Sequence, residues 1–232
     1  MALPIVNSYR KTVKSPVTEK TYEIRPYLVG EEKALMISAE SENPNEIRDA
    51  IFNMISACTT GGITKDITSF DLEYLFMEIR KLSADQIVEL NMVHKDCGGQ
   101  TPLKIDLNEI TVSDIPNKVV ILDENRKIGI KMKMPSMQDL LNIETDSASN
   151  IVKGFMLMAK SIECVFEGEE VYTDFTEEEL LSWLDNLNDK QMEKISAYIN
   201  NLPSLKMDLE YTCSGCSKHV KQEVRGIQNF LA

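Results

Sequence analysis

Two short motifs of histidine and cysteine have the spacing of metal ligands. His94 and Cys97 stand three residues apart in VHKDCGG, and Cys213 and Cys216 stand three residues apart in CSGC. In a tight turn, two side chains at this spacing reach one ion, and one imidazole with three thiolates makes the closed tetrahedral ligand set of a structural zinc site. The sequence therefore predicts that the two motifs together bind one structural zinc ion per chain.

Both motifs lie where a β-hairpin is expected to turn. Apolar and polar residues alternate over 88–94 and 103–107 around the first motif, and over 205–211 and 218–224 around the second. Gly98, Gly99 and Gly215 would let backbone amides fold toward the thiolates. Two such hairpins facing each other make a zinc ribbon, split here by a long intervening segment. Zinc would then supply folding free energy that two small hairpins cannot obtain from a hydrophobic core of their own.

Other interpretations of these residues remain open. Cys216 and His219 also have ligand spacing, although His94 completes a symmetric pair and His219 lies on an expected strand. A lone histidine on an alternating apolar face is more often a packing residue, and a single C-x-x-C arises by chance. A redox dithiol would place its first cysteine at a helix N-terminus, whereas a strand is expected after Cys216.

Helices and a further hairpin surround the two motifs. A strand is expected over 21–27, and a second hairpin over 118–135 turns at 123–125. Before the first motif, helices are expected from about Glu31, over 43–60 and over 69–83. The expected buried stripe of the helix over 43–60 comprises Ile47, Ile51, Met54 and Ile55. That of the helix over 69–83 comprises Leu72, Leu75, Phe76 and Ile79. Later helices are expected after Ser136, over 149–164, from Thr176 with Glu179 as a capping box, and over 188–202. The acidic stretch 167–179 is interpreted as a mobile loop.

These elements predict an α+β fold with a helical bundle-like body and β-hairpins, two of which form a split zinc-ribbon-like knuckle. Four segments are expected: 1–85 with the N-terminal strand and helices, 86–108 with the first knuckle hairpin, 109–204 with a hairpin and helices, and 205–232 with the C-terminal knuckle hairpin. They are expected to form one compact folding unit.

Composition narrows the class of function. The formal net charge of −12 opposes non-specific binding to nucleic acid, because neutralisation of phosphates supplies most of that affinity. No apolar run approaches the length that spans a bilayer, and residues 1–16 do not have the pattern of a secretory signal. We therefore expect synthesis in a reducing cytoplasm, where Cys58 and Cys164, each at the end of an expected helix, are small buried apolar residues.

The chain shows no nucleophile elbow, phosphate loop, H-E-x-x-H helix or dinucleotide fingerprint. Acidic pairs such as Glu169 and Glu170 fall in the expected loop and are most simply solvated. The sequence therefore predicts a protein that is not an enzyme and that has no small-molecule substrate.

In its order of motifs the chain resembles the baseplate hub family of T-even-type contractile-tailed bacteriophages. The segments RPYLVGEEK and FDLEYLFMEIRKLS carry the most distinctive similarity, which extends from about Tyr22 to Phe230. Members of that family carry two cysteines in the first knuckle; here His94 stands at the first of these positions, while Cys97, Cys213 and Cys216 match directly. Histidine also binds zinc, so the departure changes the ligand set without removing the site.

The resemblance implies a structural or assembly protein of the phage baseplate hub, a zinc-stapled adaptor that binds other tail subunits. It implies a location in the host cytoplasm during assembly and then in the tail baseplate of the virion. No nucleic acid, membrane or small-molecule partner is expected. The alternatives are a dithiol redox protein that uses Cys213 and Cys216, and a zinc-ribbon adaptor for nucleic acid.

Overall fold

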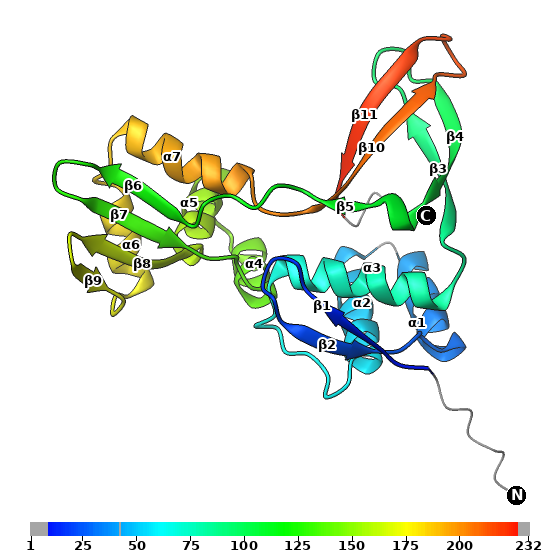
Figure 1. The fold of residues 1–232 in the computed structure, drawn as a ribbon, viewed down its shortest axis with the longest axis horizontal. Coiled ribbons are helices and arrows are strands. Elements are labelled where there is room, and N and C mark those ends of the chain that lie inside the picture. Colours follow the sequence, from blue (N-terminus) through cyan, green and yellow to red (C-terminus); the bar gives the residue numbers. More distant parts are fainter. Residues whose placement is uncertain (1–8, 42, 227–232) are drawn as a thin grey trace, which may run out of the picture. The chain divides into compact units, whose positions relative to one another are not determined.

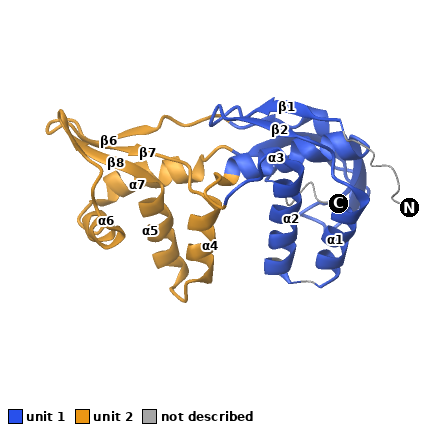
Figure 2. Cartoon of the chain, turned by 90° about the horizontal axis from the view of Figure 1, so that it is seen from below, with its two compact units in different colours: residues 1–64, 70–113, 204–232 blue, residues 65–69, 114–203 orange. Residues whose placement is uncertain are grey.

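A computed structural model describes residues 9–41 and 43–226 and confirms the α+β class, with helices and several small antiparallel sheets (Figure 1). The chain forms two compact units, coloured separately in Figure 2. Unit 1 comprises residues 1–64, 70–113 and 204–232, and unit 2 comprises 65–69 and 114–203. These boundaries differ from the four expected segments, and a single cooperative folding unit stays a prediction. Residues 1–8 and 227–232 of the terminal segments, and the end of the family resemblance at Phe230, lie outside the described residues.

The first part of unit 1 is a β-hairpin followed by three helices. The elements are β1 (Lys11–Lys14), β2 (Thr21–Ile24), α1 (Val29–Glu40), α2 (Pro44–Cys58) and α3 (Ser69–Ser83). The expected stripe of α3 is confirmed for Leu75, Phe76 and Ile79, which are buried, whereas Leu72 is half-buried. α2 begins at the cap residue Asn43, whose side chain accepts a hydrogen bond from the backbone N–H of Asn45. The strand β1 is an element that the sequence pattern did not predict.

A buried carboxylate joins this hairpin to α3. Asp71 is fully buried and accepts hydrogen bonds from the hydroxyls of Ser15 at 2.5 Å, Thr18 at 2.6 Å and Tyr22 at 2.9 Å. A buried charge is tolerated only when hydrogen bonds replace its lost water, and these three donors do so. Burial, with the bond to Asp71, raises the pKa of Tyr22 and keeps its hydroxyl protonated as a donor.

The two hairpins that carry the histidine and cysteine motifs complete unit 1. β3 (Ile87–Val93) pairs with β4 (Gln100–Asp106), and β10 (Leu205–Thr212) pairs with β11 (His219–Arg225). The expected alternation is confirmed, because the apolar residues of one face of each hairpin are buried: Val88, Leu90, Met92 and Ile105 in the first, and Leu205, Met207, Leu209 and Tyr211 in the second. A short 3-10 helix (Leu107–Glu109) leads to β5 (Thr111–Val112), which pairs with the start of β10.

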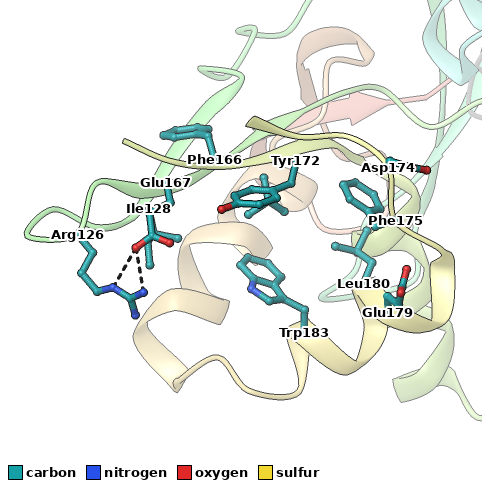
Figure 3. Close-up of a pocket in the computed structure, with 11 residues that line it drawn as sticks. Arg126, Ile128, Phe166, Glu167, Tyr172, Asp174, Phe175, Glu179, Leu180 and Trp183 are labelled. Atoms are coloured by element: carbon teal, nitrogen blue, oxygen red, sulfur yellow. Dashed lines mark hydrogen bonds and ion pairs between the residues drawn. The ribbon is translucent and has the colours of Figure 1, made fainter. Parts of the chain in front are cut away.

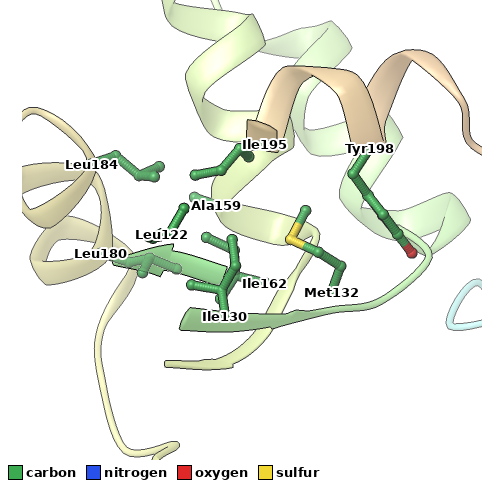
Figure 4. Packing of buried hydrophobic residues seen from close by; sticks show 9 residues of the cluster. All are labelled: Leu122, Ile130, Met132, Ala159, Ile162, Leu180, Leu184, Ile195 and Tyr198. Carbon is green, nitrogen blue, oxygen red and sulfur yellow. The ribbon is translucent and has the colours of Figure 1, made fainter. Parts of the chain in front are cut away.

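Unit 2 is a four-stranded antiparallel sheet with helices on one face. The strands are β6 (Val119–Asp123), β7 (Ile128–Met132), β8 (Ile162–Glu167) and β9 (Glu170–Tyr172), in that order across the sheet. The helices are α4 (Met137–Thr145), α5 (Asn150–Lys160), α6 (Glu177–Leu184) and α7 (Asp189–Asn200). These helices lie on one face of the sheet (Figure 2). Side chains of β6, β7 and β8 pack against α5, α6 and α7 in the core of this unit, which comprises Leu122, Ile130, Met132, Ala159, Ile162, Leu180, Leu184, Ile195 and Tyr198 (Figure 4).

Two expectations for unit 2 were wrong. The helix predicted to reach Cys164 ends at Lys160, and Cys164 lies in the middle of β8, where it is buried as predicted. The stretch 167–179 is not an irregular loop: Gly168, at a φ of 61°, helps form a two-residue turn from β8 into β9. Its last residues begin α6 with the expected capping box, in which the Glu179 carboxylate accepts from the backbone N–H of Thr176 and the Thr176 hydroxyl accepts from the backbone N–H of Glu179.

Candidate metal centre

The two motif turns have the same backbone conformation. In the first, the N–H of His94 donates to the carbonyl of Gly99 at 2.9 Å, and the N–H of Gly98 donates to the carbonyl of His94 at 2.8 Å. Gly98 has a left-handed φ of 69°. This conformation folds the turn so tightly that the side chains at its first and fourth positions, His94 and Cys97, point to the same place.

The second turn repeats these bonds at the same offsets. The N–H of Cys213 donates to the carbonyl of Lys218 at 2.9 Å, and the N–H of Ser217 donates to the carbonyl of Cys213 at 2.8 Å. Ser217 has a left-handed φ of 58°, at the position that Gly98 holds in the first turn. Cys213 and Cys216 therefore correspond to His94 and Cys97. The chain contains two equivalent knuckles, as the symmetric spacing predicted.

The knuckles bring all four candidate ligands together. One ligand atom from each of His94, Cys97, Cys213 and Cys216 lies within 4.8 Å of every other. The Nδ1 atom of His94 is 3.3 Å from the sulfur atoms of both Cys97 and Cys216, and the sulfurs of Cys97 and Cys213 are 3.6 Å apart. Tetrahedral zinc, with bonds of about 2.3 Å to sulfur and about 2.0 Å to nitrogen, separates its ligand atoms by roughly 3.5–3.8 Å. The donor set and its spacing fit such an ion.

Contacts between the turns fix the two knuckles against each other. The backbone N–H of Ser214 donates to the hydroxyl of Thr101 at 3.0 Å, and the Ser214 hydroxyl donates to the carbonyl of Gln100 at 2.5 Å. Gly99 lies directly against Gly215, where a Cβ atom on either residue would be 3.0 Å from the other's Cα. The sequence patterns did not predict this cross-hairpin packing. The signal available in the sequence was the presence of the small residues Gly99 and Gly215 beside the cysteines of the two turns.

Electrostatics in the cluster favour bound positive charge. Burial alone would raise the pKa of Cys213, but hydrogen bonds from the backbone N–H groups of Cys216 and Gly215 outweigh it and lower this pKa to about 6. The N–H of Gly99 donates to the Cys97 sulfur at 3.4 Å and lowers the Cys97 pKa, yet burial and the neighbouring sulfurs produce a net rise. Thiolates this close repel one another, and a divalent cation removes that repulsion.

The surroundings of His94 suit a ligand role. Its Nδ1 atom faces the sulfurs, and the Asp96 carboxylate lies 3.6 Å from Nε2 on the other side of the ring. A carboxylate beside the second ring nitrogen of a ligating histidine orients the ring and increases its basicity. The Nζ atom of Lys218, from the other knuckle, is 3.7 Å from the same carboxylate. His94 is 8% exposed, which is consistent with its position on the buried face of the hairpin.

The other histidine and cysteines lie outside the cluster. His219 is exposed at the start of β11, with its Nε2 atom 3.6 Å from the Glu210 carboxylate. Cys58 and Cys164 are buried elsewhere, and burial raises the pKa of Cys58 to about 12. Within residues 9–41 and 43–226, His94, Cys97, Cys213 and Cys216 make up the group with metal-ligand geometry. The expectation that Cys58 and Cys164 are buried small residues is confirmed.

Fold and site together define a small α+β protein in which two hairpins, far apart in the sequence, share a four-ligand cluster. A family model described as T4 bacteriophage base plate protein matches residues 7–232, nearly the whole chain. The chain belongs to this family of phage baseplate proteins. Membership implies association with other phage tail proteins and a location in the virion tail. A search of curated proteins and a search of solved structures gave no match.

The described helices bear on the expectation that no segment spans a bilayer. None of those in residues 9–41 and 43–226 combines the length and the apolar character that a membrane crossing requires.

Proposed function

We propose that this baseplate protein is a structural or assembly component of the hub, a zinc-stapled adaptor that binds other tail subunits. The observation that supports the zinc most directly is the cluster of His94, Cys97, Cys213 and Cys216 on two equivalent knuckles. Three thiolates and one imidazole are soft ligands that suit zinc, and a set of four protein ligands leaves no open coordination position. The metal therefore has a structural role in this proposal.

In this proposal zinc stabilises the two knuckle hairpins of unit 1. A two-stranded hairpin is marginally stable in water, and β3–β4 forms a sheet of two strands. Structural zinc in small domains contributes about 10–16 kcal/mol of apparent binding free energy, which becomes folding free energy when no site exists in the unfolded chain. An ion held by both knuckles would join the β3–β4 hairpin to the three-stranded sheet of β5, β10 and β11 within unit 1.

The two alternative functions receive less support. Cys213 is 1% exposed, which does not favour attack on a substrate disulfide, and it is followed by a turn and β11 instead of a helix. A nucleic-acid adaptor would need a basic surface, against a formal net charge of −12. A structural family also supports a role without catalysis. We therefore assign the cysteines to the metal and the protein to assembly.

Metal content tests the proposal. Purification without chelator under reducing conditions, followed by elemental analysis, is expected to give about one zinc per chain. His94→Ala and Cys213→Ser are expected to lose the zinc, and His219→Ala, the matched control outside the cluster, is expected to keep it. Retention of zinc by Cys213→Ser, or a metal-free wild-type protein, would contradict the metal site. Failure of the zinc-loaded protein to bind any tail subunit would contradict the adaptor role.

A further inference from the structure

The outer edge of the sheet in unit 2 has an open strand beside an aromatic hollow. β9 is the last strand in the order β6-β7-β8-β9, so its outer backbone N–H and C=O groups have no strand partner within the described residues. At the opposite edge, α7 covers β6: Lys194 donates to the carbonyl of Ile121 at 2.7 Å, and Gln191 donates to that of Leu122 at 3.5 Å. The chain thus covers one edge of this sheet and leaves the other open.

The hollow lies between this end of the sheet and α6 and has a volume of about 500 Å³. Tyr172, Phe175, Leu180 and Trp183 are among the residues that line it, as Figure 3 shows. Phe166, from β8, lies on the other side of the strand from Trp183 in the same view. Tyr172 is the last residue of β9 and is 46% exposed, so the hollow opens directly at the end of the free strand edge.

Acidic side chains surround both features. Residues 167–179 contain seven acidic and no basic residues. Some are paired inside the unit, as Glu167 is with Arg126 and Glu177 with Lys160. Asp174 and Glu178 are exposed and have no ion-pair partner in the described part of the chain. Negative charge on an open edge repels other acidic edges and attracts a positively charged strand.

We infer that β9 and the hollow form a docking site for an extended segment of a partner tail protein, one that carries lysine or arginine beside an apolar anchor residue. The segment would add to the sheet as a fifth strand along β9 through backbone hydrogen bonds. Its anchor side chain would enter the hollow against Trp183, and its basic residues would face Asp174 and Glu178. This inference rests on the proposed adaptor function and names the chemistry of the partner.

A second copy of this chain fits the site poorly. Pairing of two β9 edges would bring Glu170 and the other acidic residues of 167–179 against their own copies, and like charges across a strand pair are unfavourable. A basic segment reverses the sign of each of these interactions. Charge complementarity therefore selects a different protein as the occupant.

Trp183 is the single tryptophan of the chain, so its fluorescence reports on the hollow directly. The probe is a blocked hexapeptide of alternating lysine and apolar residues with one central leucine. We expect saturable change in Trp183 emission on titration into the full-length, zinc-loaded protein. The same peptide with alternate backbone nitrogens methylated cannot donate strand hydrogen bonds, and a version with glutamate for lysine reverses the charge. Both are expected to bind at least about tenfold more weakly.

Variants test the same surface. Asp174→Lys with Glu178→Lys is expected to weaken binding of the lysine peptide at least about tenfold and to reverse the preference toward the glutamate peptide. Tyr172→Ala is expected to weaken binding, whereas Ile151→Ala, which removes a 76% exposed apolar side chain from α5 of the same unit, is expected to leave it unchanged.

Equal binding of the methylated and unmethylated peptides would overturn the added strand, and no response of Trp183 to any peptide would overturn the docking site. Zinc content and recovery with tail proteins are measured on the same preparation. The surface lies wholly in unit 2 and the metal cluster wholly in unit 1. A negative peptide result with zinc and tail binding intact would therefore reject this inference and leave the proposed function standing.

Discussion

Gly99 and Gly215 contact each other across the two knuckles. A Cβ atom built on Gly99 would lie 3.0 Å from the Gly215 Cα, 3.1 Å from the Cys213 sulfur and 3.2 Å from the Cys97 sulfur. Gly99 does not have a left-handed φ, so its backbone conformation does not itself require glycine. The requirement for glycine here is steric: the absence of a side chain lets the two turns approach closely enough for four ligand atoms to meet.

Replacement of Gly99 by alanine is expected to separate the knuckles. The added methyl group meets the Gly215 backbone, which cannot rotate away, and two sulfur atoms, which can rotate only by leaving the ligand cluster. Overpacking should therefore cost about 1–3 kcal/mol of the free energy of unfolding. Zinc retention should fall with it, because the ligand atoms move apart. Urea denaturation and elemental analysis of the purified variant measure the two effects.

Gly154→Ala is the matched control for that variant. Gly154 lies inside α5, and nothing lies within 4 Å of a Cβ atom added there. Alanine is expected to raise stability by about 0.5–1 kcal/mol, because glycine is a poor residue in a helix interior, and to leave zinc content unchanged. Wild-type zinc retention in Gly99→Ala would show that the close glycine contact does not matter for the cluster.

Removal of metal is expected to loosen the knuckle hairpins selectively. With a strong chelator, amide hydrogen exchange should accelerate at least about tenfold in β3, β4, β10 and β11, since these strands lose the ion that holds them together. The strands of unit 2 pack against their own helices and should keep their protection. Mass spectrometry of exchanged peptides separates the two regions. Uniform acceleration across both units would contradict a local role for the metal.

The buried carboxylate of Asp71 is expected to be a major source of stability in the N-terminal part. Asp71→Ala leaves the hydroxyls of Ser15, Thr18 and Tyr22 without their acceptor and should cost about 3 kcal/mol or more. Tyr22→Phe removes one donor to the charged group and should cost about 1.5–3 kcal/mol. Chemical denaturation gives both values, with the exposed Asp114→Asn as a neutral control. Equal stability of Asp71→Ala and wild type would contradict this assignment.

Glu73 gives unit 1 a defined pH dependence. Burial raises its pKa from 4.5 to about 6, because the charged form loses water in the folded state. At Glu73 the folded state therefore binds more protons than the unfolded state between these values, so the contribution of this residue to stability is most favourable below pH 4.5 and falls as pH rises to about 6. Glu73→Gln should remove this decrease and stabilise the protein above pH 6 by roughly 1–2 kcal/mol.

Denaturation curves across that pH range compare Glu73→Gln with wild type. Glu40→Gln, at the exposed end of α1, is the control and should keep the wild-type profile. A stability difference between Glu73→Gln and wild type that stays constant from pH 4.5 to 6 would contradict the titration of Glu73 in this range.

The sequence predicted the candidate site because its signals are local. Alternation marks both knuckle hairpins, and the three-residue spacing of His94 with Cys97 is repeated by Cys213 with Cys216. The spacing did not predict the contact of Gly99 with Gly215 or the hydrogen bonds of Ser214 with Thr101. These interactions depend on how two hairpins that are distant in the sequence pack against each other. The local sequence pattern therefore indicates which residues are the candidate ligands, whereas the tertiary packing determines how these residues are arranged.

The fold of unit 2 was harder to predict because its helix and strand signals overlap. β8 begins at Ile162, directly after α5, with no glycine or proline to mark the change, and the run through Cys164 continues the helical apolar spacing. The acidic residues of 167–179 suggested a solvated loop. Several of them instead occupy the first turn of α6, where negative charge is favourable beside the helix N-terminus.

The pairing of Ser113 with Ser204 bears on the order in which the chain can fold. The N–H of Ser113 donates to the Ser204 carbonyl at 3.0 Å, and the N–H of Ser204 donates to the Ser113 hydroxyl at 3.0 Å, where residues 114–203 leave and rejoin unit 1. Once that insertion is folded and its ends are joined, the effective loop between Cys97 and Cys213 shrinks from over a hundred residues to roughly 25, saving about 1.3 kcal/mol of loop-closure entropy. A chain folding as it leaves the ribosome would complete the insertion first. The knuckles would then meet when the last strand is synthesised.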